Sequence, residues 1–230
     1  MKNRTIKTID VISVVIHTLI ENRFMSTKKR DNMIRTLEQV SKIISGVTNN
    51  SYTDLGTHDS QQVYLLKGND LDQNGFISVE SMEQVYLSSP QKSSRFILEG
   101  GDVVVLARGS AIRAGFVTKE IASLGVIASA NFIILRSNKS EVKGEVITAY
   151  LTSEVGREYL LALSKGAVIQ HIPASNLKSM EIPVPSMDIQ DKICEIFYAT
   201  HTAYRAAMEL AEQQKRTANA LILNLMQEAA

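Results

Sequence analysis

The chain contains 230 residues, 44% of them apolar, and its 25 Lys and Arg nearly balance 24 Asp and Glu. This balance argues against a uniformly cationic nucleic-acid binder of the histone type. The single cysteine, Cys194, permits no internal disulfide and suits a reducing compartment. The longest apolar run, residues 11–20, falls short of the roughly 20 residues that a membrane span needs. We therefore expect a cytoplasmic globular protein that does not bind membranes.

Residues 1–35 carry eight basic and three acidic side chains and are expected to form an N-terminal helical extension. Their apolar side chains recur close to helical spacing, at Ile6, Ile9, Ile12, Ile16 and Leu19. The β-branched cluster at 11–16 argues locally for a strand, but no turn residue divides the segment. The basic stretch 28–30 fits a solvated helix face better than a nucleic-acid-binding arm.

Residues 36–185 have a different pattern. Short apolar and β-branched runs, separated by glycines, predict strands at 63–66, 76–79, 96–98, 103–107, 116–118 and 131–135. Only 145–163 has a helical pattern, which Gly156 is expected to divide into two short helices. The segment is therefore predicted to form a mostly-β domain of the α+β class.

Residues 186–230 contain no glycine or proline and are predicted to form one long helix. Positions that alternate steps of four and three form a heptad seam, at Ile189, Ile193, Ile196, Thr200, Ala203, Ala207, Leu210, Gln214, Thr217 and Leu221. A helix of about 60 Å cannot bury this seam against one small domain. We therefore expect it to pair with a partner helix.

The segment 70–78 resembles the start of a calcium-binding loop, with Asp70, Asp72, Asn74 and Gly75 at matching positions. The position that needs a bidentate glutamate is Ser81, and a predicted strand precedes the segment where a helix is required. A hairpin turn that uses Asn74-Gly75 is the stronger interpretation.

Asp102, Glu141 and Lys143 resemble the carboxylates and lysine of a metal-dependent nuclease. In such sites the Glu-x-Lys tripeptide lies on a core strand, whereas here it follows a polar turn and opens a predicted helix. A solvated surface is therefore favoured. The four histidines lie far apart without metal-ligand spacing, and Cys194 is expected to pack, so no catalytic or metal-binding residue is assigned.

The best candidate binding surface lies between two predicted strands, where Arg108-Gly109-Ser110 is followed by Arg113. A glycine-bearing loop lets backbone amides, the Ser110 hydroxyl and two guanidiniums approach phosphates or guanine edges. The surrounding segment 92–119 carries five basic and two acidic side chains, a local charge of +3. An ordinary hairpin turn with exposed cations explains this composition equally well.

Several short motifs follow one another in a distinctive order. They are Ile43-Ile-Ser-Gly46, Gly101-Asp-Val-Val-Val-Leu-Ala-Arg-Gly109-Ser110, Asn131-Phe-Ile-Ile-Leu-Arg136, Gly166-Ala-Val-Ile-Gln-His-Ile172, and Ile182-Pro-Val-Pro185 followed by Gln190. This order, with a long helix after it, resembles a target-recognition domain of the specificity subunit of type I restriction–modification systems. The resemblance covers about residues 36–230 and implies DNA sequence recognition without catalysis.

The resemblance also implies partners. The chain itself is expected to hold no cofactor and to recruit a DNA methyltransferase subunit that binds S-adenosylmethionine, and in restriction complexes a restriction subunit. A usual specificity subunit has two recognition domains and two helical regions, whereas this chain resembles a half-subunit with one of each. Two copies paired antiparallel through the long helix imitate the full architecture and favour a palindromic, interrupted DNA site. The N-terminal helix is expected to pack in the same helical layer.

A second polar loop, 165–171, is expected to join the first in contacting double-stranded DNA. Arg108 or Arg113 is predicted to contact guanine, Gln170 adenine and Lys119 a phosphate. The predicted DNA-binding set is Arg108, Ser110, Arg113, Lys119, Lys165, Gln170 and His171. The predicted helix-pairing set is Ile189, Ile193, Ile196, Ala203, Ala207, Leu210 and Leu221. Two alternatives stay open, a helical assembly protein without DNA binding and the metal-dependent nuclease.

Overall fold

The computed structural model describes residues 33–56, 60–88, 94–165 and 170–228. The described residues belong to one compact unit that begins at Met33. The predicted N-terminal helix and the basic stretch 28–30 therefore lie outside the described residues. The first described element is the strand β1 (Met33–Thr36), so residues 33–35, which were predicted to end the helical extension, form a strand that pairs with β12 (Glu181–Val184) instead.

A four-stranded antiparallel sheet divides the interior of the domain into two hydrophobic layers. Its strand order is β2 (Ser41–Ser45), β10 (Phe132–Ser137), β6 (Val103–Leu106) and β8 (Arg113–Phe116). In β6, Val103 and Val105 pack into one layer, and Val104 and Leu106 pack into the other. Side chains alternate between the faces of a strand, so a strand buried on both faces has a continuous apolar run. This explains why the sequence predicted β6 and β10 well.

A second four-stranded sheet contains the parallel strand pair. Its order is β3 (Tyr52–Thr53), β5 (Glu83–Leu87), β4 (Gln62–Leu66) and β9 (Val126–Ala128), with β4 and β9 parallel. Two predicted strands are wrong, because 76–79 and 96–98 contribute only the single bridges Leu71–Ile77 and Ile97–Ile127. Short turns and one helix connect this region: η1 (Asn49–Ser51), η2 (Gly68–Asp70), η3 (Ser94–Phe96) and α4 (Lys119–Ser123).

The predicted helical segment consists of two helices, α5 (Gly144–Thr152) and α6 (Glu154–Leu163). The division lies at Ser153, not at Gly156 as predicted. The Ser153 hydroxyl accepts a hydrogen bond from the Gly156 amide at 3.1 Å, which is the geometry of a helix N-cap. A Cβ at Gly156 would lie 2.0 Å from the Tyr150 carbonyl oxygen. Gly156 therefore lets the two helices approach closely instead of separating them.

Two short antiparallel pairs connect distant parts of the chain. One pair joins β1 (Met33–Thr36) to β12 (Glu181–Val184), and the other joins β7 (Arg108–Gly109) to β11 (Gln170–His171). The remaining short helices are α2 (Leu37–Val40) and α7 (Ala174–Lys178). The β1–β12 pair places the first described residues beside the junction that leads into the last helix.

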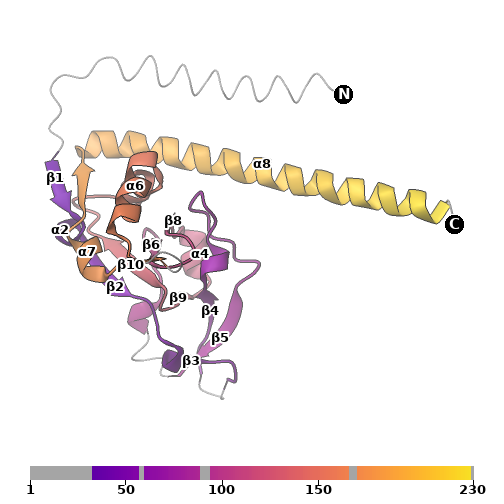
Figure 1. Ribbon diagram of the computed structural model, residues 1–230, viewed down its shortest axis with the longest axis horizontal. Helices are drawn as coiled ribbons and strands as arrows, with labels where there is room; N and C mark the ends of the chain where they lie inside the picture. Colours follow the sequence, from indigo (N-terminus) through magenta and orange to yellow (C-terminus); the bar gives the residue numbers. More distant parts are fainter. Residues whose placement is uncertain (1–32, 57–59, 89–93, 166–169, 229–230) are drawn as a thin grey trace, which may run out of the picture. The chain divides into compact units, whose positions relative to one another are not determined.

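The last helix, α8 (Met187–Glu228), confirms the predicted long C-terminal helix and, with the two sheets, the α+β fold. Its first half contacts α5, and it continues well past the elements that it contacts (Figure 1). Every side chain from 205 to 227 is exposed. Among the helices that the structure describes, none is both long and apolar enough to cross a membrane.

Candidate nucleic-acid interface and helix anchor

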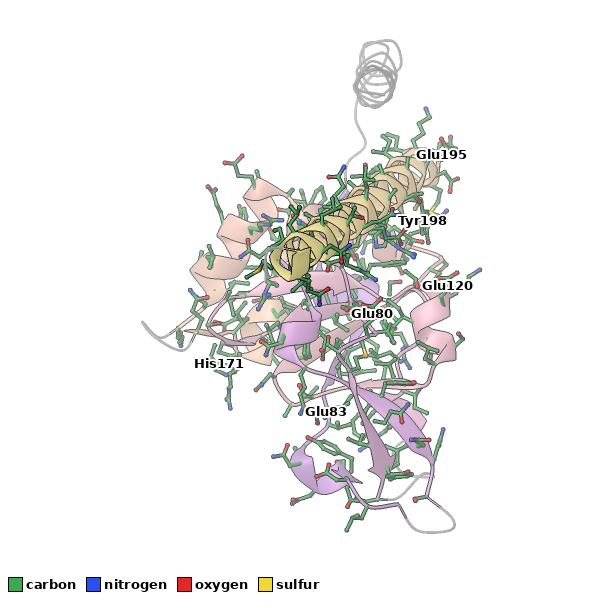
Figure 2. All side chains as sticks on the ribbon, turned by 90° about the vertical axis from the view of Figure 1, so that its right-hand side faces the viewer. Glu80, Glu83, Glu120, His171, Glu195 and Tyr198 are labelled. Atoms are coloured by element: carbon green, nitrogen blue, oxygen red, sulfur yellow. The ribbon has the colours of Figure 1, made fainter. Side chains whose placement is uncertain are left out.

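The β7–β11 pair brings together the two polar loops that were predicted separately. Arg108 lies opposite His171, and Gly109 lies opposite Gln170. A hydrogen bond of 2.8 Å from the Ile172 amide to the Ala107 carbonyl extends the pairing. Figure 2 shows His171 at the edge of the domain, well below α8 in that view. We call this surface the β7–β11 edge and define it by Arg108, Ser110, Lys165, Gln170 and His171.

The edge has an irregular backbone that the sequence did not predict. The Ala107 and Arg108 amides both donate to the Asn131 carbonyl, at 2.8 and 3.1 Å. Two residues of one strand thus oppose a single residue of its neighbour, which is the pattern of a β-bulge. Bulges occur at sheet edges and beside functional sites, where they redirect a side chain. Here the bulge immediately precedes the pairing of Arg108 with His171.

The structure distinguishes the two predicted guanidiniums. Arg108 is exposed, and its guanidinium has no hydrogen-bond or ion-pair partner in the described part of the chain. Arg113 is half-buried and donates from Nη1 to the Leu71 carbonyl at 2.6 Å. Arg108 is therefore free to contact a ligand, whereas Arg113 holds the segment that contains Leu71.

Lys119 lies apart from the β7–β11 edge. In the β6–β8 pair, Leu106 is opposite Arg113 and Val103 is opposite Phe116. The Leu106 end of this pair is the one next to Arg108. Lys119 begins α4 just after Phe116, so it lies beyond the opposite end. The β7–β11 edge therefore contains five of the seven predicted DNA-binding residues. Arg113 lies at the near end of the β6–β8 pair but is bound to the Leu71 carbonyl, and Lys119 lies at the far end.

Two polar atoms at the edge are buried without a partner. They are Oε1 of Gln170 and Nδ1 of His171, neither of which has a hydrogen-bond partner in the structure as described. The backbone next to them is well satisfied, because Lys165 and His171 exchange two amide–carbonyl hydrogen bonds of 2.9 Å. Such unsatisfied atoms are uncommon in folded proteins, and Thr36, Arg113, Ser129 and Ser137 each have one outside this edge.

The residues proposed for a nuclease are engaged in structural contacts. Asp102 is buried, and both of its carboxylate oxygens accept hydrogen bonds from Arg136, at 3.0 and 2.8 Å. Lys143 pairs with Asp191 on α8, which raises the pKa of the lysine. No group of three metal-binding side chains occurs among the residues described. The arrangement does not favour the nuclease.

The segment that resembles a calcium loop forms a hydrogen-bonded turn. Oδ1 of Asp72 accepts from the Asn74 and Phe76 amides, at 2.7 and 2.9 Å. Gly75 has a φ of 86°, a conformation that favours glycine. The buried Asp70 carboxylate accepts from the Lys67 amide and the Ser81 hydroxyl, at 2.7 and 2.8 Å. The carboxylates thus stabilise the turn, and we call residues 70–78 the Asp72 turn.

The Asp72 turn holds α8 against the domain through aromatic contacts. The Phe76 ring stacks on Tyr204 and contacts His201, with both ring centroids 4.2 Å away. The Tyr204 hydroxyl bonds to Asn74 at 2.9 Å and to Asp72 at 3.2 Å. Burial and the nearby Arg205 lower the pKa of His201, although Asp72 opposes this shift. The sequence analysis did not identify this contact, because its residues are far apart in the chain.

Gln190 anchors the beginning of α8. It is 1% exposed, and its Oε1 accepts from the Lys143 amide at 3.0 Å. Its Nε2 donates to the Glu141 and Pro185 carbonyls, at 2.9 and 3.0 Å. One side chain thus satisfies a donor and an acceptor just before α5 and a second acceptor at the Pro junction. This explains physically why a glutamine follows that junction.

The face of α8 that contacts the domain is displaced from the predicted seam by one residue. The contacting side chains are Gln190, Cys194, Phe197, His201 and Tyr204. Burial raises the pKa of Cys194 to about 11, consistent with its expected packing role. Beside this face, the Tyr198 hydroxyl donates to Glu145 at 2.5 Å. Figure 2 shows Tyr198 at the lower side of the helix.

The predicted seam itself is largely uncovered. Ile189 and Ile193 are half-buried near the domain, but Ile196, Leu210 and Leu221 are 47%, 45% and 58% exposed. Ala203 is half-buried, and Ala207 is exposed. Large apolar side chains thus remain exposed at intervals along the predicted seam.

Comparisons with known proteins agree on one family. Residues 31–216 match the family described as the type I restriction modification DNA specificity domain. No curated protein sequence matches the chain significantly.

Solved structures share the fold. The type I restriction-modification S subunit from M. genitalium superposes with a TM-score of 0.51 and 18% identity, over 81% of this chain and 42% of that one. The HsdS subunit from Thermoanaerobacter tengcongensis superposes with a TM-score of 0.53 and 17% sequence identity. The match covers 84% of this chain and 48% of that one. A chain from a structural study of complex assembly of the type I R-M system superposes with a TM-score of 0.56 and 18% sequence identity. The match covers 84% of this chain and 48% of that one.

This chain thus spans less than half of the length of these solved relatives. The match to the family covers more than four-fifths of the chain, from residue 31 just before β1 to residue 216 within α8. It confirms the resemblance seen in the order of sequence motifs, and it does not favour the assembly-protein or nuclease alternatives. The chain belongs to the type I restriction modification DNA specificity domain family.

Proposed function

We propose that this protein is the DNA-recognition subunit of a type I-like restriction–modification methyltransferase complex and that it reads one half of the DNA site. The observation that carries the proposal is the β7–β11 edge, which joins two distant polar loops beside an exposed Arg108 without a partner in the described chain. Base reading requires a local set of hydrogen-bonding groups and not a basic protein, so the net charge of +1 is compatible with it.

Within this function, the residues of the edge have different roles. Arg108 reads guanine, because a guanidinium matches the two acceptors of that base in the major groove. Gln170 supports the edge and is not assigned a base, because its Oε1 is buried and adenine needs this acceptor. Ser110, Lys165 and His171 bind nearby base edges or phosphates. Lys119, at the far end of the β6–β8 pair, contacts a phosphate only if the DNA extends along that pair.

The catalytic step is assigned to a partner. The chain acts as a non-catalytic subunit, and a methyltransferase subunit that binds S-adenosylmethionine transfers the methyl group. The exposed part of α8 is the docking element, since it carries large apolar side chains far from its own domain. A restriction subunit joins the same complex where restriction accompanies modification. The single cysteine suits a reducing compartment, which supports assembly in the cytoplasm.

The same helix provides self-association. The described chain carries one recognition domain, and two copies of it supply the two domains that a usual specificity subunit has. Antiparallel pairing through Ile196, Leu210 and Leu221 places the two domains at opposite ends, which favours a palindromic, interrupted site. Ala203 and Ala207 allow close helix approach between these contacts.

The test is co-expression with candidate methyltransferase subunits, followed by co-purification and mapping of methylated sites in DNA. We expect a stable complex, methylation at one interrupted sequence, and salt-sensitive DNA retention. The matched variant Arg108→Ala should still assemble with the methyltransferase but lose methylation at that sequence. Absence of both a methyltransferase complex and salt-sensitive DNA binding would contradict the proposal.

A further inference from the structure

Asn131 lies in the turn that precedes β10. Because the first residue of β10, Phe132, is opposite the last residue of β6, Leu106, this turn lies next to the end of β6. Its side chain is exposed, and its carboxamide has no hydrogen-bond partner in the described ranges. Its backbone carbonyl is the acceptor for both the Ala107 and Arg108 amides, at 2.8 and 3.1 Å. The backbone of Asn131 is therefore held next to Arg108 while its side chain remains free.

The surrounding hydrogen bonds make this neighbourhood rigid. The Ala107 carbonyl accepts from the Ile172 amide at 2.8 Å, which connects the bulge to β11. On the other side, the Ser129 amide donates to the Leu66 carbonyl at 3.0 Å. The turn 129–131 is thus held between β4 and the β7–β11 pair. Side chains on backbone fixed in this way are suited to precise contacts, because little conformational entropy is lost on binding.

The two free side chains have complementary chemistry. The Arg108 guanidinium offers parallel donors, which match the N7 and O6 acceptors of guanine. The Asn131 carboxamide offers one donor and one acceptor, which match N7 and the N6 amino group of adenine. Asn138, at the other end of β10, differs because its side chain already bonds to Ser140 and Glu141. Asn131 therefore has a side chain that is free to bind a ligand, whereas the Asn138 side chain stabilises a turn.

We propose that Asn131 is a specificity-determining residue that hydrogen-bonds an adenine in the major groove beside the base read by Arg108. This inference rests on the proposed DNA-recognition function. It adds to the recognition surface a residue of a third loop, which lies outside both polar loops identified from the sequence. The recognised half-site then contains an adenine close to the guanine that Arg108 contacts.

The experiment first selects preferred sequences from a random duplex DNA library with the full-length chain in complex with its methyltransferase partner. Binding constants are then measured for the wild type, Asn131→Ala and the matched control Asn138→Ala. Each duplex is also made with single adenines replaced by purine, which lacks the N6 amino group. Thermal unfolding of each variant checks that the fold is retained.

We expect Asn131→Ala to weaken binding to the selected DNA by about 5- to 150-fold and to leave binding to unrelated DNA unchanged. One purine replacement should weaken wild-type binding similarly and have little further effect on Asn131→Ala. Asn138→Ala should bind as the wild type does. Wild-type affinity and sequence preference in Asn131→Ala, with loss of specificity in Arg108→Ala, would overturn the inference and leave the proposed function intact. Failure of the wild-type complex to select any sequence would overturn both.

Discussion

Arg108 and His171 lie directly opposite each other in the β7–β11 pair, although they come from distant parts of the chain. This pairing converts two separate polar loops into one surface. It also sets Arg108 apart from Arg113, whose guanidinium is bound to the Leu71 carbonyl. The two arginines are therefore expected to behave differently when each is replaced.

Arg108→Ala should reduce affinity for the cognate DNA by about 1–3 kcal/mol, because a bidentate base contact is lost. Binding measured against salt concentration, on cognate and unrelated duplexes, tests this. Arg95→Ala removes the same charge from an exposed residue elsewhere in the domain and serves as the control. Equal losses in the two variants would show that Arg108 contributes only its charge.

Arg113→Ala should act mainly on stability. It removes a charged donor from the Leu71 carbonyl and should lower the free energy of unfolding by about 1–3 kcal/mol. Urea denaturation measures this loss. The DNA affinity of the folded variant should change less than that of Arg108→Ala. A larger loss of specific affinity in Arg113→Ala, without a change in stability, would be incompatible with the observed contact.

Gln190→Ala should destabilise the protein, because it removes the partner of one backbone donor and two backbone acceptors that connect α8 to the start of α5 and to the Pro junction. We expect a loss of about 2–3 kcal/mol in the free energy of unfolding. Gln213→Ala, on the exposed part of α8, is the matched control and should be within about 0.5 kcal/mol of the wild type. Similar urea midpoints for both variants would argue against an anchoring role.

Stability should fall as the pH is lowered through the range in which His201 titrates. The pKa of His201 in the folded protein lies below its ordinary value of 6.5, so the unfolded chain takes up the proton more readily. The contribution of neutral His201 to the free energy of unfolding is therefore complete above pH 6.5. It is lost as the pH falls through the lowered pKa of His201 in the folded protein. Arg205 opposes protonation and Asp72 favours it.

Urea midpoints at pH 7.5 and pH 5.5, for the wild type and His201→Phe, test this effect. Phenylalanine keeps an aromatic ring against Phe76 but cannot be protonated. We expect a smaller decrease in the variant than in the wild type. The same decrease in both proteins would assign the pH dependence to other groups.

Leu210→Glu should weaken self-association through α8, because it places a charge on the exposed apolar seam. Sedimentation velocity at tens of micromolar should show a shift from dimer to monomer. Asn219→Glu introduces the same residue at an exposed position away from the seam and should leave the dimer intact. A wild-type protein that is monomeric both alone and with the methyltransferase would rule out pairing.

Local pattern was sufficient for strands that are buried on both faces and for a helix whose second half is exposed. The apolar runs of β6 and β10 and the uninterrupted length of α8 were predicted because each depends on its own residues. β5 was missed, since it has only two buried apolar residues, Val85 and Leu87, and is stabilised by pairing with β3 and β4. The runs 76–79 and 96–98 contain residues typical of strands, but each forms only a single bridge to another segment.

The candidate site shows the same division. Sequence alone determined the class of fold and the family, because these depend on composition and the order of motifs. Only the tertiary structure decided which cations are free, that Asn131 lies beside Arg108, and which face of α8 is bound by Gln190, Phe197 and Tyr204. These features depend on hydrogen bonds and packing between segments far apart in the chain, where a shift of one residue turns a helical side chain by about 100°.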